Sequence, residues 1–312
     1  MRVLVVGAGA TGGYFGARLV EAGRDVTFLV RPARAEKLAA SGLRVKSPAG
    51  DIHIAEPPTL TAADLAAGKG GRFDLVLLSC KAYDLDGAIA DVAPAVGPAT
   101  LVLPVLNGLR HLDALDAAFG PENVLGGSCA IVATVRGDGE IRMMSPLHSL
   151  TFGERAGGRS ERVERIEALM QGVAFQARLS EAMVLEMWEK WTFLATLAGA
   201  TCLMRATIGD IVAAPGGLAL IEALMEECRR IAEDAGYAPR EKVMQNTRTS
   251  LTAEGSAFTA SMLRDIENKA RIEADHIIGD LIARSRDGAH PMLDRAYTHL
   301  KAYENRRARE AA

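Results

Sequence analysis

Residues 3–13 of the chain read VLVVGAGATGG, an apolar run followed directly by a cluster of glycines. The apolar run is typical of a buried strand, and the residues after the glycines have the pattern of a helix. Gly7, Gly9 and Gly12 fit the GxGxxG pattern, in which the glycines permit a tight turn, close approach to a pyrophosphate, and tight packing of helix on strand. A glycine-rich turn without a ligand is the alternative. We expect a dinucleotide-binding loop made of Gly7, Ala8, Gly9, Ala10, Thr11 and Gly12.

The rest of the N-terminal half alternates between strand-like and helix-like segments. Apolar runs at residues 26–30, 75–79, 101–106 and 124–135 are separated by Ala-rich or polar connections. Such runs are typical of a parallel sheet that is buried on both faces. The pattern therefore predicts an α/β domain with a Rossmann-type, doubly wound sheet.

A hairpin is predicted near the end of this half. The GDG sequence at residues 137–139 has the composition of a tight turn, and the strand-like residues 140–143 follow it. Residues 150–152 are interpreted as one further strand.

The second half changes to a helical period, with no further strand pattern. A length of 312 residues allows two domains that each bury a core. We predict an NADP-binding Rossmann domain at residues 1–178 and an all-helical domain at residues 179–312. The clearest predicted helices are residues 183–203, 218–235 and 262–285.

Composition excludes several classes of function. The chain has 36 Lys and Arg residues against 39 Asp and Glu, a net charge of −3, which gives no bulk attraction to nucleic acid or to an anionic membrane. Prolines and glycines interrupt the longest uncharged run, residues 92–109, so no membrane span is expected. The first apolar run is too short for a secretory signal, and we expect a cytoplasmic protein. The four cysteines lack metal-ligand spacing and are expected to be structural thiols, with no metal site.

Two arginines follow the second predicted strand. Many NAD sites have an acidic residue at this position, to bind the ribose hydroxyls, but here it is Arg31. A guanidinium matches a phosphate in shape and charge, and Arg34 lies one helical turn further along. The pair predicts binding of the 2′-phosphate of NADP(H), with a solvated arginine pair as the alternative.

Lys81 and Asn107 follow two neighbouring predicted strands of the sheet. The carboxyl ends of parallel strands form the ligand-binding edge of such sheets. An ammonium and a carboxamide placed there can contact the cofactor and a substrate oxygen. Solubility and turn geometry explain the same residue types equally well.

Lys190 lies between Trp188 and Trp191 in the most apolar part of the second half. Burial and a nearby cofactor are expected to lower its pKa, which suits a proton donor to a developing alkoxide. The alternative is a lysine whose ammonium reaches solvent along the tryptophan faces. Ser261 and Glu273 lie 12 residues apart on a predicted helix, just over three turns, so they can share one face. Without further evidence, the preferred interpretation is a helix cap and a solvated carboxylate.

In this order, these residues resemble the ketopantoate reductase (2-dehydropantoate 2-reductase) family over nearly the whole chain. The resemblance implies a Rossmann domain, a helical C-terminal domain with the active site between them, and NADPH-dependent reduction of a 2-oxo acid to a 2-hydroxy acid, as in pantothenate biosynthesis. The matching motifs are the GxGAxG loop, Arg31, Lys81-Ala82-Tyr83, Asn107-Gly108, Trp188-x-Lys190, Ser261-Met262-Leu263-x-Asp265 and Glu273-x-Asp275.

The resemblance also implies roles for single residues. Lys190 matches the family's general acid, and Glu273 is expected to assist it by orienting the substrate or the lysine. Asn107 and Lys81 match contacts to cofactor and substrate, and Ser261 and Glu273 match substrate-binding positions. A monomer or homodimer is expected.

Two positions after Lys190 depart from the family pattern, and so does Leu293, which ends Pro291-Met292-Leu293 where the family has Pro-x-Asn. The family has asparagines four and eight residues after the catalytic lysine, where this chain has Leu194 and Ala198. The departure predicts a substrate with a more apolar tail than 2-dehydropantoate, unless Thr192, Thr196 or Thr201 replaces the amides. Two other functions stay open: a protein that binds NADP(H) without turnover, and an opine- or imine-type dehydrogenase that requires an amine.

Overall fold

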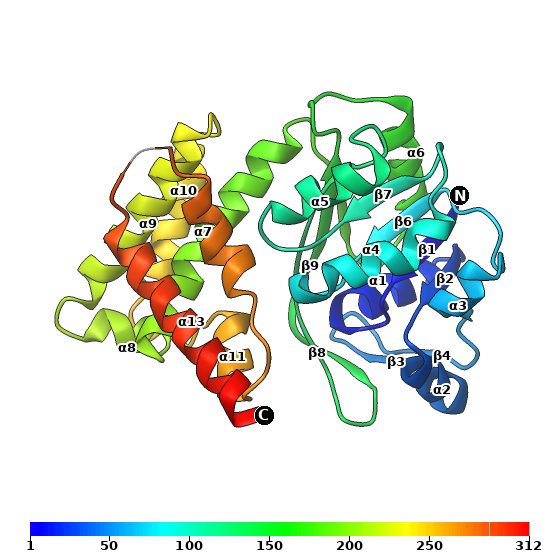
Figure 1. Ribbon diagram of the computed structural model, residues 1–312, viewed down its shortest axis with the longest axis horizontal. Helices are drawn as coiled ribbons and strands as arrows, with labels where there is room; N and C mark the ends of the chain where they lie inside the picture. The colour runs from blue at the N-terminus through cyan, green and yellow to red at the C-terminus, as the bar shows by residue number, and fades with distance from the viewer. Residues whose placement is uncertain (287, 312) are drawn as a thin grey trace. The chain divides into compact units, whose positions relative to one another are not determined.

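The computed structural model describes residues 1–286 and 288–311, and the chain divides into two compact units (Figure 1). The short segment Asn107–Arg110 groups with the C-terminal half, although residues on both sides of it belong to the first unit. The domain boundary after residue 178 remains a prediction. The first unit comprises Met1–Leu106 and His111–Met183, and the second comprises Asn107–Arg110 and Val184–Ala312.

Five parallel strands form the first sheet: β1 (Arg2–Val6), β2 (Asp25–Leu29), β5 (Thr59–Leu60), β6 (Leu75–Leu78) and β7 (Leu101–Pro104). Their order in the sheet is β5-β2-β1-β6-β7. All residues of β6 and β7 are buried, because apolar side chains cover both faces. The predicted Rossmann-type sheet is therefore confirmed. Its central strand is β1, so the loop that follows β1 lies between the loops that follow β2 and β6.

Helices connect these strands. The first helix packs against β1 and β2, and it ends just before Gly23, whose φ of +76° is a left-handed conformation. The helices of this unit are α1 (Ala10–Glu21), α2 (Pro32–Ser41), α3 (Ala62–Ala66), α4 (Leu85–Val92), α5 (Arg110–Phe119) and α6 (Glu161–Leu169), with 3-10 turns at Ala82–Asp84 and Ala93–Ala95.

A second sheet corrects the predicted place of residues 124–135. Only Val124 bridges to the parallel sheet, through Val102, whereas the following residues pair in antiparallel fashion with a long strand, β9 (Ile141–Gly153). The GDG turn joins the two strands of this hairpin. Residues 126–135 therefore form their hydrogen bonds with the other arm of the hairpin and not with the parallel sheet. Residues 150–152 are the end of β9 and not a separate strand. The other strands of this sheet are β8 (Gly126–Val135), β3 (Leu43–Lys46), β4 (Ile52–Ile54) and β10 (Gln176–Leu179).

The second unit is helical, as predicted, and no helix of the described residues is long and apolar enough to cross a membrane. The single helix predicted at residues 262–285 is wrong. It breaks at Lys269, which has φ of +55°, and the chain resumes as a π-helix at Asp275–Gly279. The helices are α7 (Met183–Met204), α8 (Ile208–Ala213), α9 (Gly217–Asp234), α10 (Glu241–Leu251), α11 (Ser261–Glu267), α12 (Asp280–Ala283) and α13 (Pro291–Ala311).

Candidate active site

The glycine-rich loop joins the end of β1 to the start of α1. Gly7 has φ of +92°, and its N–H donates a 2.9 Å hydrogen bond to the Leu29 carbonyl at the end of β2. A Cβ atom at Gly9 would meet no atom within 4 Å, so the main chain there is accessible. A Cβ atom at Gly12 would lie 2.1 Å from Oγ of Ser79 and 2.4 Å from the Gly7 carbonyl oxygen. The loop thus combines a tight turn, an accessible main chain and a closely packed helix, as a dinucleotide-binding loop requires.

Arg31 follows β2 and precedes the first residue of α2. Its side chain is 75% exposed, and its Nη2 atom lies 3.0 Å from Oδ2 of Asp84. Asp84 ends the 3-10 turn that follows β6. Because β1 lies between β2 and β6, this ion pair joins the loops on either side of the glycine-rich loop. Sequence reasoning missed Asp84, since the pair forms between residues that are far apart in the chain.

Arg34 contacts the main chain on two sides. Its Nη2 atom donates to the carbonyl oxygens of Ala8, at 2.9 Å, and of Gly139, at 3.2 Å. Gly139 belongs to the turn between β8 and β9, so Arg34 connects that turn to the glycine-rich loop. Burial lowers the pKa of Arg34. The contact between Arg34 and the 2′-phosphate remains a prediction. Ala10 and Thr11, the last of the predicted loop residues before Gly12, are half-buried at the start of α1.

Lys81 and Asn107 follow strands β6 and β7. Lys81 is exposed and immediately precedes the 3-10 turn that contains Asp84. Ser79, two residues earlier, donates from Oγ to the Val6 carbonyl at 3.0 Å, next to the glycine-rich loop. Sequence reasoning missed Ser79, although its position directly after a buried strand is a usable signal. Asn107 is half-buried and belongs to the second unit.

The loop at Asn107 packs on the π-helix of the second unit. His276 is 5% exposed, and its ring makes a hydrogen bond to the main chain of Asn107. A Cβ atom at Gly108, which has φ of +71°, would lie 2.8 Å from the His276 carbonyl oxygen. Sequence reasoning missed His276 because a π-helix has no characteristic sequence pattern.

Lys190 is half-buried on α7. The flanking Trp188 and Trp191 are 3% and 0% exposed, and their ring centroids lie 5.1 Å apart, so the pair belongs to the core of the helical unit. The neighbouring Glu189 is also buried and accepts hydrogen bonds from the main chain and guanidinium of Arg240. These contacts fix the segment of α7 that carries Lys190.

The two positions after Lys190 that depart from the family pattern lie in apolar surroundings in the structure. Leu194 is half-buried, one helical turn after Lys190, and Ala198 is 4% exposed. Whether the threonines replace the missing amides remains a prediction to be tested with substrates, but all three are buried in the helical unit. The hydroxyls of Thr196 and Thr201 donate to carbonyls of α7 itself, those of Thr192 and Leu197, and Thr192, Thr196 and Thr201 are at most 1% exposed.

Ser261 and Glu273 do not share a helix. Ser261 is the exposed first residue of α11, whereas Glu273 is half-buried and lies two residues before the π-helix. The break at Lys269 removes the helical register on which their predicted common face depends. Their roles in substrate binding remain predictions.

Two further kinds of chemistry can be checked among the described residues, metal binding and reaction at the buried thiols. No group of three or more His, Cys, Asp or Glu side chains in this part of the chain could hold a metal ion. Burial raises the pKa values of the Cys202 and Cys228 thiols to about 12, so both stay protonated.

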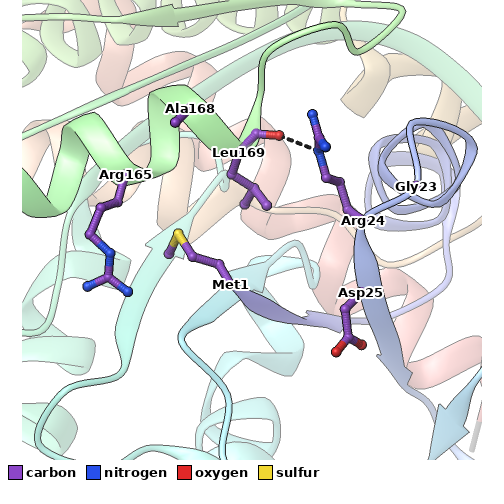
Figure 2. Close-up of a pocket in the computed structure, with 7 residues that line it drawn as sticks. All are labelled: Met1, Gly23, Arg24, Asp25, Arg165, Ala168 and Leu169. Carbon is purple, nitrogen blue, oxygen red and sulfur yellow. Dashed lines mark hydrogen bonds between the residues drawn. The ribbon is translucent and has the colours of Figure 1, made fainter.

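A cavity of about 450 Å³ lies beside the amino ends of strands β1 and β2 of the first sheet (Figure 2). Met1 and Asp25, at the amino ends of β1 and β2, contribute to its wall. Arg24 crosses this region and donates from Nε to the Leu169 carbonyl at 2.8 Å. The glycine-rich loop lies at the other end of β1, so this cavity is not part of the candidate site.

Comparison with known proteins identifies the family. Residues 3–157 match the model described as "Ketopantoate reductase PanE/ApbA", and residues 182–304 match the model of its C-terminal part. The chain is 38% identical to the uncharacterized oxidoreductase YkpB of Bacillus subtilis (strain 168), over 97% of this chain and 99% of that protein. It is 29% identical to the 2-dehydropantoate 2-reductase of Mesorhizobium japonicum, over 94% and 95% of the two chains.

A solved structure gives the same result. The crystal structure of 2-dehydropantoate 2-reductase from Methylococcus capsulatus superposes with a TM-score of 0.86 at 27% identity, and the match covers 98% of both chains. Fold and sequence agree over both units, and the chain therefore belongs to the ketopantoate reductase family of oxidoreductases.

Proposed function

We propose that this protein is an NADPH-dependent reductase that converts a 2-oxo acid into the corresponding 2-hydroxy acid. The observation that carries the proposal is the glycine-rich loop, where the position of a Cβ atom is open at Gly9 and blocked at Gly12. The main chain at Gly9 is accessible to a pyrophosphate, and the close packing at Gly12 holds the N-terminus of α1 next to it. Both features are those of a dinucleotide-binding loop.

Arg31 supports NADPH as the dinucleotide. It follows β2 at the position where NAD enzymes usually have a carboxylate, and its guanidinium is exposed. A guanidinium offers paired N–H donors that fit the 2′-phosphate. Lys81 and Asn107 are the proposed contacts to the nicotinamide end.

When bound, the reduced nicotinamide supplies the hydride. Lys190 is the proposed general acid, which gives its Nζ proton to the oxygen of the substrate carbonyl. Its backbone is held by buried neighbours on α7, which favours a fixed proton donor. Ser261 and Glu273 are the proposed contacts to the substrate, and Glu273 also orients the lysine.

The substrate is proposed to be 2-dehydropantoate or, preferentially, a 2-oxo acid with a more apolar tail. Leu194 and Ala198 offer no hydrogen-bond partner on the helix that carries Lys190, and the nearby threonine hydroxyls bond within that helix or are buried. A buried hydroxyl without a partner costs about 1–3 kcal/mol, so the 4-hydroxyl of 2-dehydropantoate should weaken its binding.

The proposal is tested by following NADPH absorbance with a panel of 2-oxo acids, each with and without an amine. The panel contains 2-dehydropantoate together with branched aliphatic and aromatic 2-oxo acids. Oxidation of NADPH without amine supports the proposal. A strict requirement for the amine would indicate an imine-reducing enzyme, and NADPH binding without turnover of any substrate would indicate a sensor, so either result overturns it.

A further inference from the structure

We propose that His276 is a positioning residue, which fixes the Asn107 loop relative to the helix that carries Lys190. The role of this link in catalysis rests on the proposed function, in which Asn107 contacts the cofactor and Lys190 donates the proton. The link itself is a set of contacts within the second unit, and these contacts do not depend on the proposed function.

The contact between His276 and the loop leaves no free space. The His276 ring is buried, it makes a hydrogen bond to the main chain of Asn107, and its Cδ2 atom would lie 3.0 Å from a Cβ atom at Gly108. Only a glycine allows the loop to approach this closely. The position of the Asn107 main chain is therefore set by the histidine.

The charge state of His276 suits this role. Burial lowers its pKa most strongly, and Arg110 adds to the lowering, whereas Glu273, Asp280 and the bond to Asn107 act in the opposite direction. The net result is a lowered pKa and a neutral ring at pH 7. A neutral imidazole has one N–H donor, and because the bond to Asn107 raises the pKa of the ring, the ring donates this N–H to the Asn107 carbonyl.

The π-helix is itself fixed from two other helices. Nε1 of Trp191 on α7 donates a 2.9 Å hydrogen bond to the Ile277 carbonyl, and the Trp191 side chain is completely buried. On the other side, the Tyr297 hydroxyl and the Lys301 ammonium of α13 bind the carboxylate of Asp275, at 2.6 Å and 2.9 Å. Single turns of π-helix are rare and occur frequently at functional sites.

These contacts form a continuous chain from one proposed active-site residue to the other. Trp191 is the neighbour of Lys190 on α7, Ile277 is the neighbour of His276 on the π-helix, and His276 binds the main chain of Asn107. A change in either hydrogen bond should therefore move the carboxamide of Asn107 relative to Nζ of Lys190.

The test compares His276→Phe, which removes the donor and keeps a ring, with Tyr297→Phe, which removes a different bond to the same π-helix. Hydrogen–deuterium exchange of residues 107–110 is measured in the full chain, together with kcat and KM and the binding of 2′,5′-ADP. His276→Phe should speed exchange of the loop and lower kcat/KM roughly tenfold, the loss expected for one good hydrogen bond. Binding of 2′,5′-ADP should stay unchanged, because the glycine-rich loop and Arg31 lie in the other unit.

His276→Gln, which keeps an N–H donor, should recover part of both losses. The proposal is overturned if His276→Phe leaves the exchange of residues 107–110 at the wild-type rate, or if Tyr297→Phe speeds it equally. If His276→Phe fails to fold, His276→Leu replaces it with the same expected results. The exchange measurement needs no substrate, so it decides on the proposed link even if the protein reduces no 2-oxo acid.

Discussion

The guanidinium of Arg31 lies 3.0 Å from the carboxylate of Asp84, across the end of the central strand β1. Arg31 is also the proposed ligand of the 2′-phosphate of NADPH. A carboxylate and a phosphate therefore compete for one guanidinium, and Asp84 places a negative charge where the phosphate is proposed to bind.

Replacing Asp84 should increase the preference for NADPH. In Asp84→Asn, the repulsion of the phosphate and the competing ion pair are both lost, whereas NADH carries no phosphate to be repelled. An exposed ion pair contributes up to about 1 kcal/mol, so we expect the ratio of kcat/KM for NADPH over NADH to rise by up to about fivefold. Asp86→Asn, at an exposed position two residues later, is the control and should leave the ratio unchanged.

The two arginines should respond differently to substitution. Arg31→Ala should lower the NADPH to NADH ratio of kcat/KM roughly tenfold or more, because a charge-assisted hydrogen bond to the phosphate is lost. Arg34→Ala should weaken the binding of both cofactors, because Arg34 fixes the glycine-rich loop through the Ala8 carbonyl, and it should lower the NADPH to NADH ratio less than Arg31→Ala does. An unchanged ratio in Arg31→Ala would contradict the NADPH assignment.

Lys190→Ala should lower kcat by about a hundredfold to ten-thousandfold, the usual effect of removing a positioned general acid. Binding of NADPH, measured by its fluorescence, should be unaffected. Lys242→Ala on α10 removes an exposed lysine of the same unit and serves as the control. Near-normal kcat in Lys190→Ala with the best substrate would rule out the proton-donor role.

Local sequence patterns were sufficient to predict the first sheet and the glycine-rich loop. The apolar runs of β1, β2, β6 and β7 and the glycines after β1 are signals that lie within a few residues of the elements they specify. Residues 126–135 were misassigned because an isolated apolar run does not reveal its partner, and here the partner is the other arm of a hairpin.

The break in the C-terminal helix depends on contacts that are distant in sequence. Lys269 adopts its left-handed conformation while Arg307 donates to its carbonyl oxygen, and Tyr303 donates to that of the following residue, Ala270. Both donors lie on α13. The link between His276 and Asn107 likewise joins residues far apart in the chain, so no local pattern predicts it.

Stability should fall as the pH decreases below about 6.5, the ordinary pKa of histidine. Burial lowers the pKa values of His148, His276 and His299. Since these groups are neutral in the folded state and gain protons more readily when unfolded, their contribution is complete above pH 6.5 and is lost on acidification. The unfolding midpoint should therefore decrease between about pH 6.5 and 5, before most carboxylates titrate. His299→Gln should reduce this slope, whereas substitution of the exposed His53 should not.

Substrate choice should depend on the face of α7 that follows Lys190. Leu194 is half-buried and Ala198 is almost completely buried, so the two positions differ in what they tolerate. Leu194→Asn places an amide one turn from Lys190 without filling the core, while Ala198→Asn must fit a larger polar group into buried space and is expected to lower the unfolding midpoint.

Leu194→Asn should therefore shift specificity toward 2-dehydropantoate. A hydrogen bond to its hydroxyl is worth about 0.5–1.5 kcal/mol, which corresponds to a roughly two- to tenfold gain in kcat/KM relative to a branched aliphatic 2-oxo acid. Leu218→Asn, at a 44% exposed position of α9, is the control for a leucine-to-asparagine change away from Lys190. If the wild-type protein already reduces 2-dehydropantoate best, with kcat/KM of about 10⁴ M⁻¹s⁻¹ or more, the apolar preference is wrong and the two replaced asparagines are dispensable.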